Sequence, residues 1–549
     1  MADRQAPQTA STDGQGRLSG LRPRLSRTAR ALVGSEIDVP EDDPRTHGRL
    51  VEFAGLEGKE ERERYWLEAP YAFVSINYDP ETTEHVYHVV EPELTDLEAE
   101  LLGRLYEDIR GPLLYRDGVA EDPERALQEA LSDLLEEYGV ELDDETIFRL
   151  YYYLNRSFLG YGKIDPLMRD PHIEDISCDG PGLPIFLYHD EYTDIETSVT
   201  FEADRLSDFV SRLAQRSGRH VSVSDPVVST TLPDGSRVEL ALGEEVTPKG
   251  SAFTIRKYAE EPFTPIDLLE YGTVSAEMLA YTWLAIEHNK SLLFAGGTAA
   301  GKTTTMNAVS MFIPPRSKVI TIEDTRELAL YHDNWLSAMT RERAGEDDIT
   351  MYDLLRSALR HRPEYIIVGE VRGQEAITLF QAMNTGHTTF STMHADSVQT
   401  VINRLENEPI NVPRPMVSSL DMLWVQVLTR SEGERVRRAK TLAEIEGIDQ
   451  RTGELDYSTS FAWNAPEDTF SRRGSALLEE IQEERGWTRS ELLTELRNRK
   501  RFLAYLRAEE VSDYRRFTAM VRKYYADPEE VIERVDAAGV ETPGKPREV

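Results

Sequence analysis

A short loop in the middle of the chain has residue types that bind phosphate. Residues 296–303 read GGTAAGKT, which fits the pattern G-x-x-x-x-G-K-[ST] in full. Small residues let backbone N–H groups approach phosphate oxygens, and the N-terminus of a following helix adds its dipole. An apolar run, SLLFA, precedes the loop and a helical pattern follows it, which is the context that the motif requires. The sequence therefore predicts a P-loop that binds a nucleotide.

The residues of this loop have separate predicted roles. Lys302 is expected to reach the β- and γ-phosphates, and Thr303 is expected to coordinate Mg²⁺. The predicted cofactors are therefore ATP and Mg²⁺. The alternative is a chance glycine-rich turn, which the complete motif in its proper context disfavours. The rest of the predicted nucleotide cradle is Gly296, Gly297, Thr298, Ala299, Ala300, Gly301 and Thr304.

Acidic residues close two further apolar segments. EYIIVGE ends at Glu370, and VITIEDTRE runs into Glu323, Asp324 and Glu327. Acids at the carboxyl ends of strands beside a P-loop suit a metal ion and an activated water. Asp324 and Glu370 are the predicted metal-binding acids, and Glu323, Glu327 and Glu370 are the predicted catalytic acids. For each of them the alternative is a helix cap or a solvated side chain.

Two histidines flank the next apolar segment, TGHTTFSTMHADS. His387 and His394 should lie near opposite ends of a strand. A zinc site would need third and fourth ligands, and the sequence nearby offers no such cluster. Either residue could be a structural histidine. The functional interpretation is a sensor that hydrogen-bonds the γ-phosphate or a catalytic carboxylate.

The elements around these motifs indicate an α/β domain over residues 263–450. Apolar strands alternate with helices there, which favours a parallel sheet. Beyond about residue 465 the pattern becomes helical and charged with both signs, which predicts a helical C-terminal extension over 465–549. The predicted strands are KSLLFAGG, KVITIED, EYIIVGE, TTFSTMH and KTLAEIEGID.

Three further segments precede this domain. Residues 165–258 read as short strands, hairpins and one amphipathic helix, a small α+β domain. Residues 60–164 are mixed and mainly helical, with a hairpin formed by YAFVSINY and HVYHVVEP. Residues 1–45 predict a disordered basic head, either a solvated tail or a contact with an anionic membrane surface.

The composition of the chain disfavours several classes of protein. The 549 residues include 62 Lys and Arg against 99 Asp and Glu, a formal charge of -37, which counts against a broad DNA-binding face. The excess of acidic residues has two explanations: a negative surface that repels nucleic acid, or an adaptation to a very salty cytoplasm. We favour the second. Cys178 is the only cysteine, which excludes an intramolecular disulfide and a cysteine zinc site. Neither a signal peptide nor a membrane span is visible, so we expect a cytoplasmic protein.

Together, four blocks in this order resemble the type II/type IV secretion ATPase family. GGTAAGKT resembles its Walker A motif, TIEDTREL its Asp box, YIIVGEVRG its Walker B motif and TGHTTFSTMHADS its His box. The stretch YWLEAPYAFVSINY…YHVVEPELTDLE is similar to the archaeal branch, and the acidity fits a haloarchaeal member. The resemblance covers roughly residues 60–450. The four-cysteine zinc module of the bacterial assembly branch is absent.

This resemblance implies a RecA-like fold and a hexameric ATPase with nucleotide between the small domain and the P-loop domain. Arginines of the small domain would reach the nucleotide as fingers, because a guanidinium stabilises charge on phosphoryl oxygens. The matching positions are Arg219 and Arg237, as catalytic residues, and Arg256, as a nucleotide-binding residue. Glu370 would polarise the water and His394 would sense the γ-phosphate, with the Asp box competing with Glu370 for the role of catalytic base.

The resemblance also implies a function and its partners. The enzyme would power a type IV pilus-like filament or an archaellum through a polytopic membrane platform protein, at the inner face of the membrane, with pilin or archaellin subunits as indirect partners. The motifs leave three alternatives open: a nucleic-acid-translocating hexamer, a nucleotide-gated scaffold with little turnover, and a small-molecule kinase, for which no acceptor lid is visible. They do not separate pilus from archaellum, or assembly from rotation or retraction.

Overall fold

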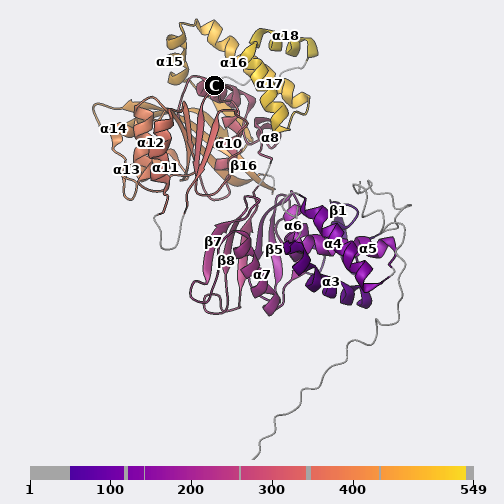
Figure 1. Ribbon diagram of the computed structural model, residues 1–549. Helices are drawn as coiled ribbons and strands as arrows, with labels where there is room; N and C mark the ends of the chain where they lie inside the picture. The colour runs from indigo at the N-terminus through magenta and orange to yellow at the C-terminus, as the bar shows by residue number, and fades with distance from the viewer. Residues whose placement is uncertain are drawn as a thin grey trace, which may run out of the picture. The chain divides into compact units, whose positions relative to one another are not determined.

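Two nine-stranded sheets organise the chain, one in each of two units, Met1–Tyr258 and Ala259–Val549 (Figure 1). The computed structural model describes residues 50–115, 122–140, 142–258, 261–341, 348–431 and 434–539. The predicted basic head, residues 1–45, lies outside the described residues. None of the helices in the described ranges is both long enough and apolar enough to cross a bilayer.

The sheet of the first unit has the strand order β1-β2-β3-β6-β5-β4-β9-β8-β7. The predicted hairpins β2–β3 and β7–β8 are confirmed. Strand β3 also pairs with β6 in parallel, through Val86↔Glu196 and Tyr87↔Thr197. Strands from the segments 60–164 and 165–258 therefore share one sheet, a long-range pairing that local patterns do not encode. The strands are β1 (Glu60–Glu68), β2 (Ala72–Asp79), β3 (Glu84–Val90), β4 (Ile173–Cys178), β5 (Pro184–His189), β6 (Thr193–Thr200), β7 (Val227–Thr231), β8 (Arg237–Ala241) and β9 (Ala252–Arg256).

Three helices of this unit pack around a small core of their own, which includes Leu105, Leu131 and Leu150. The second of them begins with Pro123 after the Asp122 cap and ends at Gly139 in the left-handed region, both residue types that are common at these helix ends. The helices of the unit are α3 (Asp96–Tyr115), α4 (Pro123–Tyr138), α5 (Asp144–Phe158), η1 (Gly162–Ile164), α6 (Asp165–Arg169) and α7 (Ala203–Arg216).

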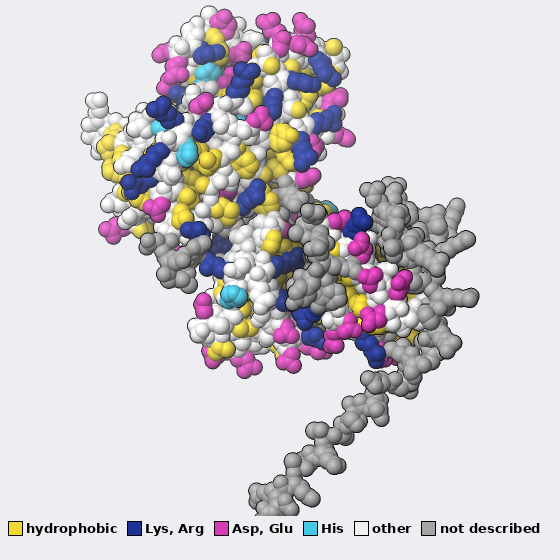
Figure 2. Space-filling model, in the orientation of Figure 1, with side chains coloured by type: hydrophobic (Ala, Val, Ile, Leu, Met, Phe, Trp, Pro, Cys, Tyr) yellow, Lys and Arg dark blue, Asp and Glu magenta, His cyan; other side chains and the backbone are white. Residues whose placement is uncertain are grey.

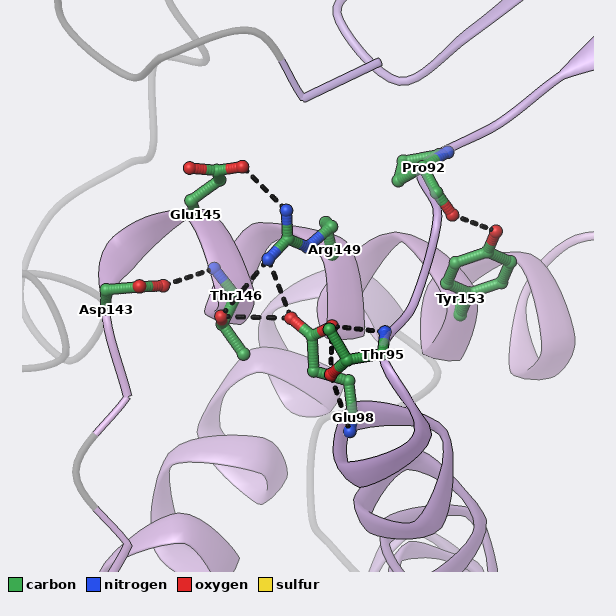
Figure 3. Close-up of polar contacts among 8 residues, drawn as sticks. All are labelled: Pro92, Thr95, Glu98, Asp143, Glu145, Thr146, Arg149 and Tyr153. Atoms are coloured by element: carbon green, nitrogen blue, oxygen red, sulfur yellow. Dashed lines mark hydrogen bonds and ion pairs between the residues drawn. The ribbon is translucent and has the colours of Figure 1, made fainter. Parts of the chain in front are cut away.

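A buried carboxylate ties the start of α3 to α5 (Figure 3). Oε2 of Glu98 accepts hydrogen bonds from the backbone N–H and the hydroxyl of Thr95, at 2.7 and 2.8 Å. Its Oε1 accepts from Arg149 at 2.7 Å and from the Thr146 hydroxyl at 3.1 Å. Burial alone would raise the pKa of Glu98, but these bonds outweigh it and lower that pKa to about 2.

We expect Glu98→Gln to loosen α3 and α5 in a pH-dependent way. The folded-state pKa lies below the unfolded value, so the carboxylate stabilises the fold above about pH 5 and loses that effect as pH falls towards 2. The difference from the native chain should be about 2 kcal/mol at neutral pH and should vanish at the acid end. Hydrogen exchange of peptides from both helices, compared at each pH, measures it. Glu100→Gln, in an exposed pair with Arg104, is the matched control and should change little.

The sheet of the second unit has the order β12-β11-β13-β14-β10-β15-β16-β17-β18. The strands from β12 to β15 are parallel, as predicted for this domain, and the pairs from β15 to β18 are antiparallel. The prediction that KTLAEIEGID continues the parallel sheet is wrong, because β16 follows β15 without an intervening helix. The strands are β10 (Leu292–Gly296), β11 (Val319–Glu323), β12 (Trp335–Met339), β13 (Tyr365–Val368), β14 (Thr388–His394), β15 (Met422–Ser431), β16 (Glu434–Ile448), β17 (Leu455–Asn464) and β18 (Thr469–Arg472).

Helices cover both faces of this sheet, and alternate residues of its strands face opposite cores. Leu292 and Phe294 of β10 belong to one core, and Leu293 and Ala295 belong to the other. The helices are α8 (Pro265–Glu270), α9 (Ala276–Glu287), α10 (Lys302–Ser310), α11 (Met351–Ala358), η2 (Leu359–His361), α12 (Glu375–Asn384), α13 (Val398–Glu406), α14 (Arg414–Val417), α15 (Ala476–Arg485), α16 (Arg489–Ala508), α17 (Tyr514–Ala526) and α18 (Pro528–Ala538).

The C-terminal helices α15 to α18 lie together at the top of the second unit in Figure 1. Their buried side chains belong to the first of these cores. Trp283 of α9 stacks on Phe312 with ring centroids 4.9 Å apart, and its indole N–H donates to the Tyr525 hydroxyl of α17 at 2.9 Å. Arg499 of α16 is 2% exposed and bonds Glu287 of α9 at 2.5 Å. The segment predicted as a charged extension thus contributes side chains to the interior of the unit, and its helices begin only after β17 and β18, which the sequence did not predict.

Candidate nucleotide site

The glycine-rich loop connects β10 to α10, as the motif requires. Gly301 caps α10 with a φ of 84°, a left-handed conformation that suits glycine. Gly296 has no room for a side chain, because a Cβ there would lie 2.6 Å from the backbone oxygen of Gln426 on β15. At Gly297 a Cβ would meet no atom within 4 Å, so the loop is open on that side. This open loop at a helix N-terminus fits a chain of phosphates.

Lys302 lies over the loop that it follows. Its ammonium donates to the backbone oxygen of Gly297 at 2.9 Å, and the residue is 8% exposed. Burial lowers the pKa of Lys302, while the carboxylates of Glu370 and Glu327 oppose that shift. Thr303 and Thr304 follow it in the first turn of α10.

Glu370 and His394 are brought together at the carboxyl edge of the sheet. Strand β14 lies between β13 and β10, and His394 at its end pairs in register with Gly296. Nε2 of His394 is 3.4 Å from Oε1 of Glu370, whose other oxygen accepts from Arg372 at 2.6 Å. Burial, followed by the charge of Lys302, lowers the pKa of His394. A neutral imidazole therefore lies beside a carboxylate, next to the loop.

The three acids of the TIEDTRE segment have different surroundings. Glu323 is 1% exposed, and its Oε1 accepts from the backbone N–H groups of Glu327 and Leu328, both at 2.9 Å. Burial raises its pKa to about 7, against the effect of these two bonds. Asp324 accepts from the Thr340 hydroxyl at 3.0 Å. Glu327 acts electrostatically on Lys302. The geometry gives Glu323 the environment of a turn-forming carboxylate, whereas Glu327 and Glu370 lie near the loop.

A magnesium ion fits this edge better than a zinc ion does. Within the described ranges no three His, Cys, Asp or Glu side chains are grouped so as to hold a metal. His387 precedes β14 at the end opposite His394, where its ring nitrogen contacts Thr385 and the backbone oxygen of Ala382. Mg²⁺ needs few protein ligands, because water and phosphate oxygens supply the rest. Thr303 with Asp324 or Glu370 offers oxygen donors of the required kind.

The predicted arginines lie in the first unit, and two of them are neighbours. Arg237 of β8 and Arg256 of β9 are cross-strand partners and line one hollow of about 440 Å³ on the sheet. Arg256 bonds Asp175 at 3.0 Å, and Arg237 lies 3.4 Å from Glu239. Arg219 follows α7 and does not line this hollow. Two adjacent guanidinium groups suit recognition of phosphate oxygens.

The sequence did not reveal two residues that shape the loop. Arg437 of β16 donates to the backbone oxygen of Ala299 at 3.0 Å, and its Cδ lies 3.2 Å from a Cβ placed on Gly301. Gln426 of β15 approaches Gly296, as described above. Both come from strands that continue the sheet beyond β10, and no motif marks them.

The C-terminal helix α17 holds the segment that follows β11. Arg522 donates to the backbone oxygen of Tyr331 at 2.8 Å and lies 3.5 Å from the carboxylate of Asp333. The Tyr331 ring packs edge-on against Tyr514, with centroids 5.9 Å apart. The same segment carries Glu327, four residues before Tyr331, so α17 holds the chain close to an acid near the loop.

We expect Arg522→Ala to lower kcat for ATP hydrolysis about tenfold, since small displacements of positioning groups are costly. The KM for ATP should change little, because no contact of Arg522 reaches the P-loop. Arg522→Lys should recover part of the loss. Arg497→Ala, an exposed arginine of α16, is the control. Steady-state phosphate release measures all four proteins, and an unchanged kcat in Arg522→Ala would contradict the expectation.

Known proteins resemble this chain over most of its length. Residues 163–531 match the family described as Type II/IV secretion system protein, and residues 19–93 match the family described as PilB3-like, N-terminal. Uncharacterized protein MJ0900 of Methanocaldococcus jannaschii is 35% identical over 88% of this chain and 94% of the relative. Type IV secretion system protein PtlH of Bordetella pertussis is 31% identical over 43% of this chain and 79% of the relative. Among solved structures, the Legionella pneumophila ATPase DotB is 17% identical over 68% of this chain and 94% of that chain, with a TM-score of 0.38.

Proposed function

Since this chain belongs to the type II/IV secretion system protein family and is an ATPase, we propose that it is a hexameric motor that drives assembly of a pilus-like filament or an archaellum. One observation carries the proposal. Glu370 and His394 lie 3.4 Å apart at one edge of the sheet, where the charge of Glu370 acts on Lys302, and His394 pairs in register with the first glycine of the loop. This arrangement suits hydrolysis of a bound nucleotide.

The residues of the loop would bind the nucleotide and its metal. The loop amides and Lys302 would hold the β- and γ-phosphates, and Thr303 with Asp324 would face Mg²⁺. Bound Mg²⁺ would supply charge neutralisation at the phosphates. Glu370 would orient the water and accept its proton, and His394, as a neutral donor, would report the γ-phosphate to Glu370.

Arginines of the first unit would complete the site. Arg237 and Arg256 share a hollow, each beside an acid that holds its guanidinium. In this proposal they face the phosphates of a P-loop domain, and Arg219 contributes from the loop after α7. A ring of subunits would then couple hydrolysis to domain rotation.

The cellular role rests on the relatives and on composition. A relative from an archaeon spans nearly the whole chain, and the N-terminal match is PilB3-like, which supports the archaeal branch. The charge of -37 supports a haloarchaeal member and disfavours a nucleic-acid motor. The motor would act at the inner face of the membrane, with a polytopic platform protein passing its motion to pilin or archaellin subunits.

A mixing experiment tests the motor. In an equal mixture of Lys302→Ala and Arg237→Ala subunits, each inactive alone, about a quarter of the sites regain both groups if the arginine serves a neighbouring subunit. ATP hydrolysis should therefore reappear on mixing, and the specific activity of the native chain should rise with protein concentration. No recovery and no concentration dependence would refute the subunit-shared site. Stimulation by DNA across several salt concentrations would favour the nucleic-acid motor, and nucleotide binding without turnover would favour the scaffold.

A further inference from the structure

Helices α16 and α17 carry a net positive charge in a strongly acidic protein, whereas α15 and α18 are each net negative. From residue 489 to residue 523, which spans α16 and α17, the sequence has ten Lys and Arg against five Asp and Glu, whereas the whole chain has a charge of -37. On the face that Figure 2 shows, dark blue side chains of Lys and Arg lie over this part of the molecule, interspersed with magenta side chains of Asp and Glu. A local excess of this sign attracts anions.

Two of these cations, together with a third from α18, line one hollow. It has a volume of about 270 Å³ and lies among the last three helices and the connection between α16 and α17. Its floor is apolar and aromatic, with Tyr505 and Val511 buried. The cations that line it are Arg516 and Lys523 of α17 and Arg534 of α18.

The cations of this hollow are exposed, and within the described part of the chain no carboxylate lies in ion-pair contact with them. Glu509 is the acid that lines the hollow, and no ion pair joins it to the three. By contrast, the neighbouring Arg501 and Arg522 are engaged, by Asp536 and by the contacts to Tyr331 and Asp333. Among the residues that line the hollow, three cations therefore stand against one carboxylate.

We propose that this hollow binds a phosphate group, presented either by the headgroup of an anionic lipid or by a free polyphosphate. Two guanidinium forks and an ammonium match the oxygens of a phosphate. The volume lies just below the range of sites for drug-sized ligands, so it suits one phosphate-bearing group rather than an extended peptide. The proposal rests on local geometry and stands whether or not the chain is a filament motor.

The site would also report to the candidate nucleotide site. Arg516 and Lys523 lie on the same helix as Arg522, which holds the segment carrying Glu327. A phosphate bound at the hollow would therefore contact the same helix that holds this segment. Phosphate binding at the hollow would give helices α16 to α18 a function in addition to their packing in the core.

The test uses the full chain and the variant Arg516→Gln, Lys523→Gln, Arg534→Gln. Cosedimentation is measured with vesicles of phosphatidylcholine and with vesicles that also contain phosphatidylglycerol. Calorimetry with pyrophosphate is measured with Lys302→Ala present in every protein, so that the P-loop does not contribute, and one ionic strength is used throughout. The control removes the same charge from α16 outside the hollow: Arg489→Gln, Arg497→Gln, Lys500→Gln. Because each cation near an anionic surface contributes about 1 kcal/mol, the three substitutions should weaken binding about 100-fold, with little change in the control.

The outcomes separate the sources. If the triple variant binds only phosphatidylglycerol vesicles more weakly than the native chain, the ligand is a lipid headgroup. If it binds only pyrophosphate more weakly, the ligand is a free polyphosphate. Weaker binding to both probes supports a site for the phosphate group itself. Equal weakening in the control means general charge attraction and overturns the site, as does the absence of binding to either probe by the native chain. If the triple variant melts at a lower temperature than the native chain, the pair Lys523→Gln, Arg534→Gln replaces it and should weaken binding about 30-fold.

Discussion

Lys302→Ala should abolish ATP hydrolysis, with kcat/KM falling by at least about 10³-fold. Lys302 is the buried cation of the loop, held 2.9 Å from the Gly297 backbone oxygen. Without its ammonium, the charge that develops on the phosphates has no compensating cation at that point. Phosphate release in the presence of Mg²⁺ measures the loss, and fluorescence of a labelled nucleotide measures the accompanying loss of affinity.

The matched control for this variant is Lys318→Ala. Lys318 precedes β11, at the amino end of the sheet, and so lies away from the carboxyl edge where the loop is. It should hydrolyse ATP at nearly the native rate. If Lys302→Ala kept normal turnover, the loop would not be the catalytic nucleotide site, and both the enzyme mechanism and the motor proposal would fall together.

Glu370→Gln should lower hydrolysis by about 10³-fold while ATP binding stays within a few-fold of native, because a general base contributes to the chemical step. The amide keeps the shape and a hydrogen bond to Arg372 but cannot accept the proton of a water. Single-turnover measurements separate the chemical step from binding. The expected signature is a subunit that holds ATP without cleaving it.

Glu323→Gln is the informative comparison, since both acids are candidate bases from the sequence. Glu323 is buried and its Oε1 is occupied by two backbone N–H groups, a contact that the amide oxygen of glutamine can keep. We therefore expect less than a tenfold loss of rate. The reverse ranking, with Glu323→Gln inactive and Glu370→Gln active, would move the base to the acidic segment after β11.

The sequence predicted the loop and its neighbours because their signals are local. GGTAAGKT fixes its own turn, and the carboxyl ends of parallel strands meet at one edge, so Glu370 and His394 could be placed beside it. The sequence could not tell which acid of TIEDTRE points into the protein. The segment has three carboxylates within five residues, and the sequence pattern is compatible with any of them being buried. In the structure Glu323 is the buried one, and amides of its own turn bind its Oε1.

Long-range pairings explain the remaining differences. The β3–β6 pairing joins residues that are more than a hundred positions apart, and the sequence of neither strand indicates its partner. Strands β16 to β18 carry mixed polar and apolar residues, and they pair antiparallel after a parallel sheet. For that reason Arg437, which contacts the loop from β16, had no sequence signal.

The shared core of α9 and the C-terminal helices limits how these proteins can be recombined. Trp283, Phe312, Arg499 and Tyr525 interlock across more than two hundred residues of chain. A chimera that exchanged only the last four helices for those of a relative would bring an unmatched set of side chains against Trp283. The side chains of α15 to α18 must therefore match those of α9 and α10. A chimera that folds must exchange these two segments together.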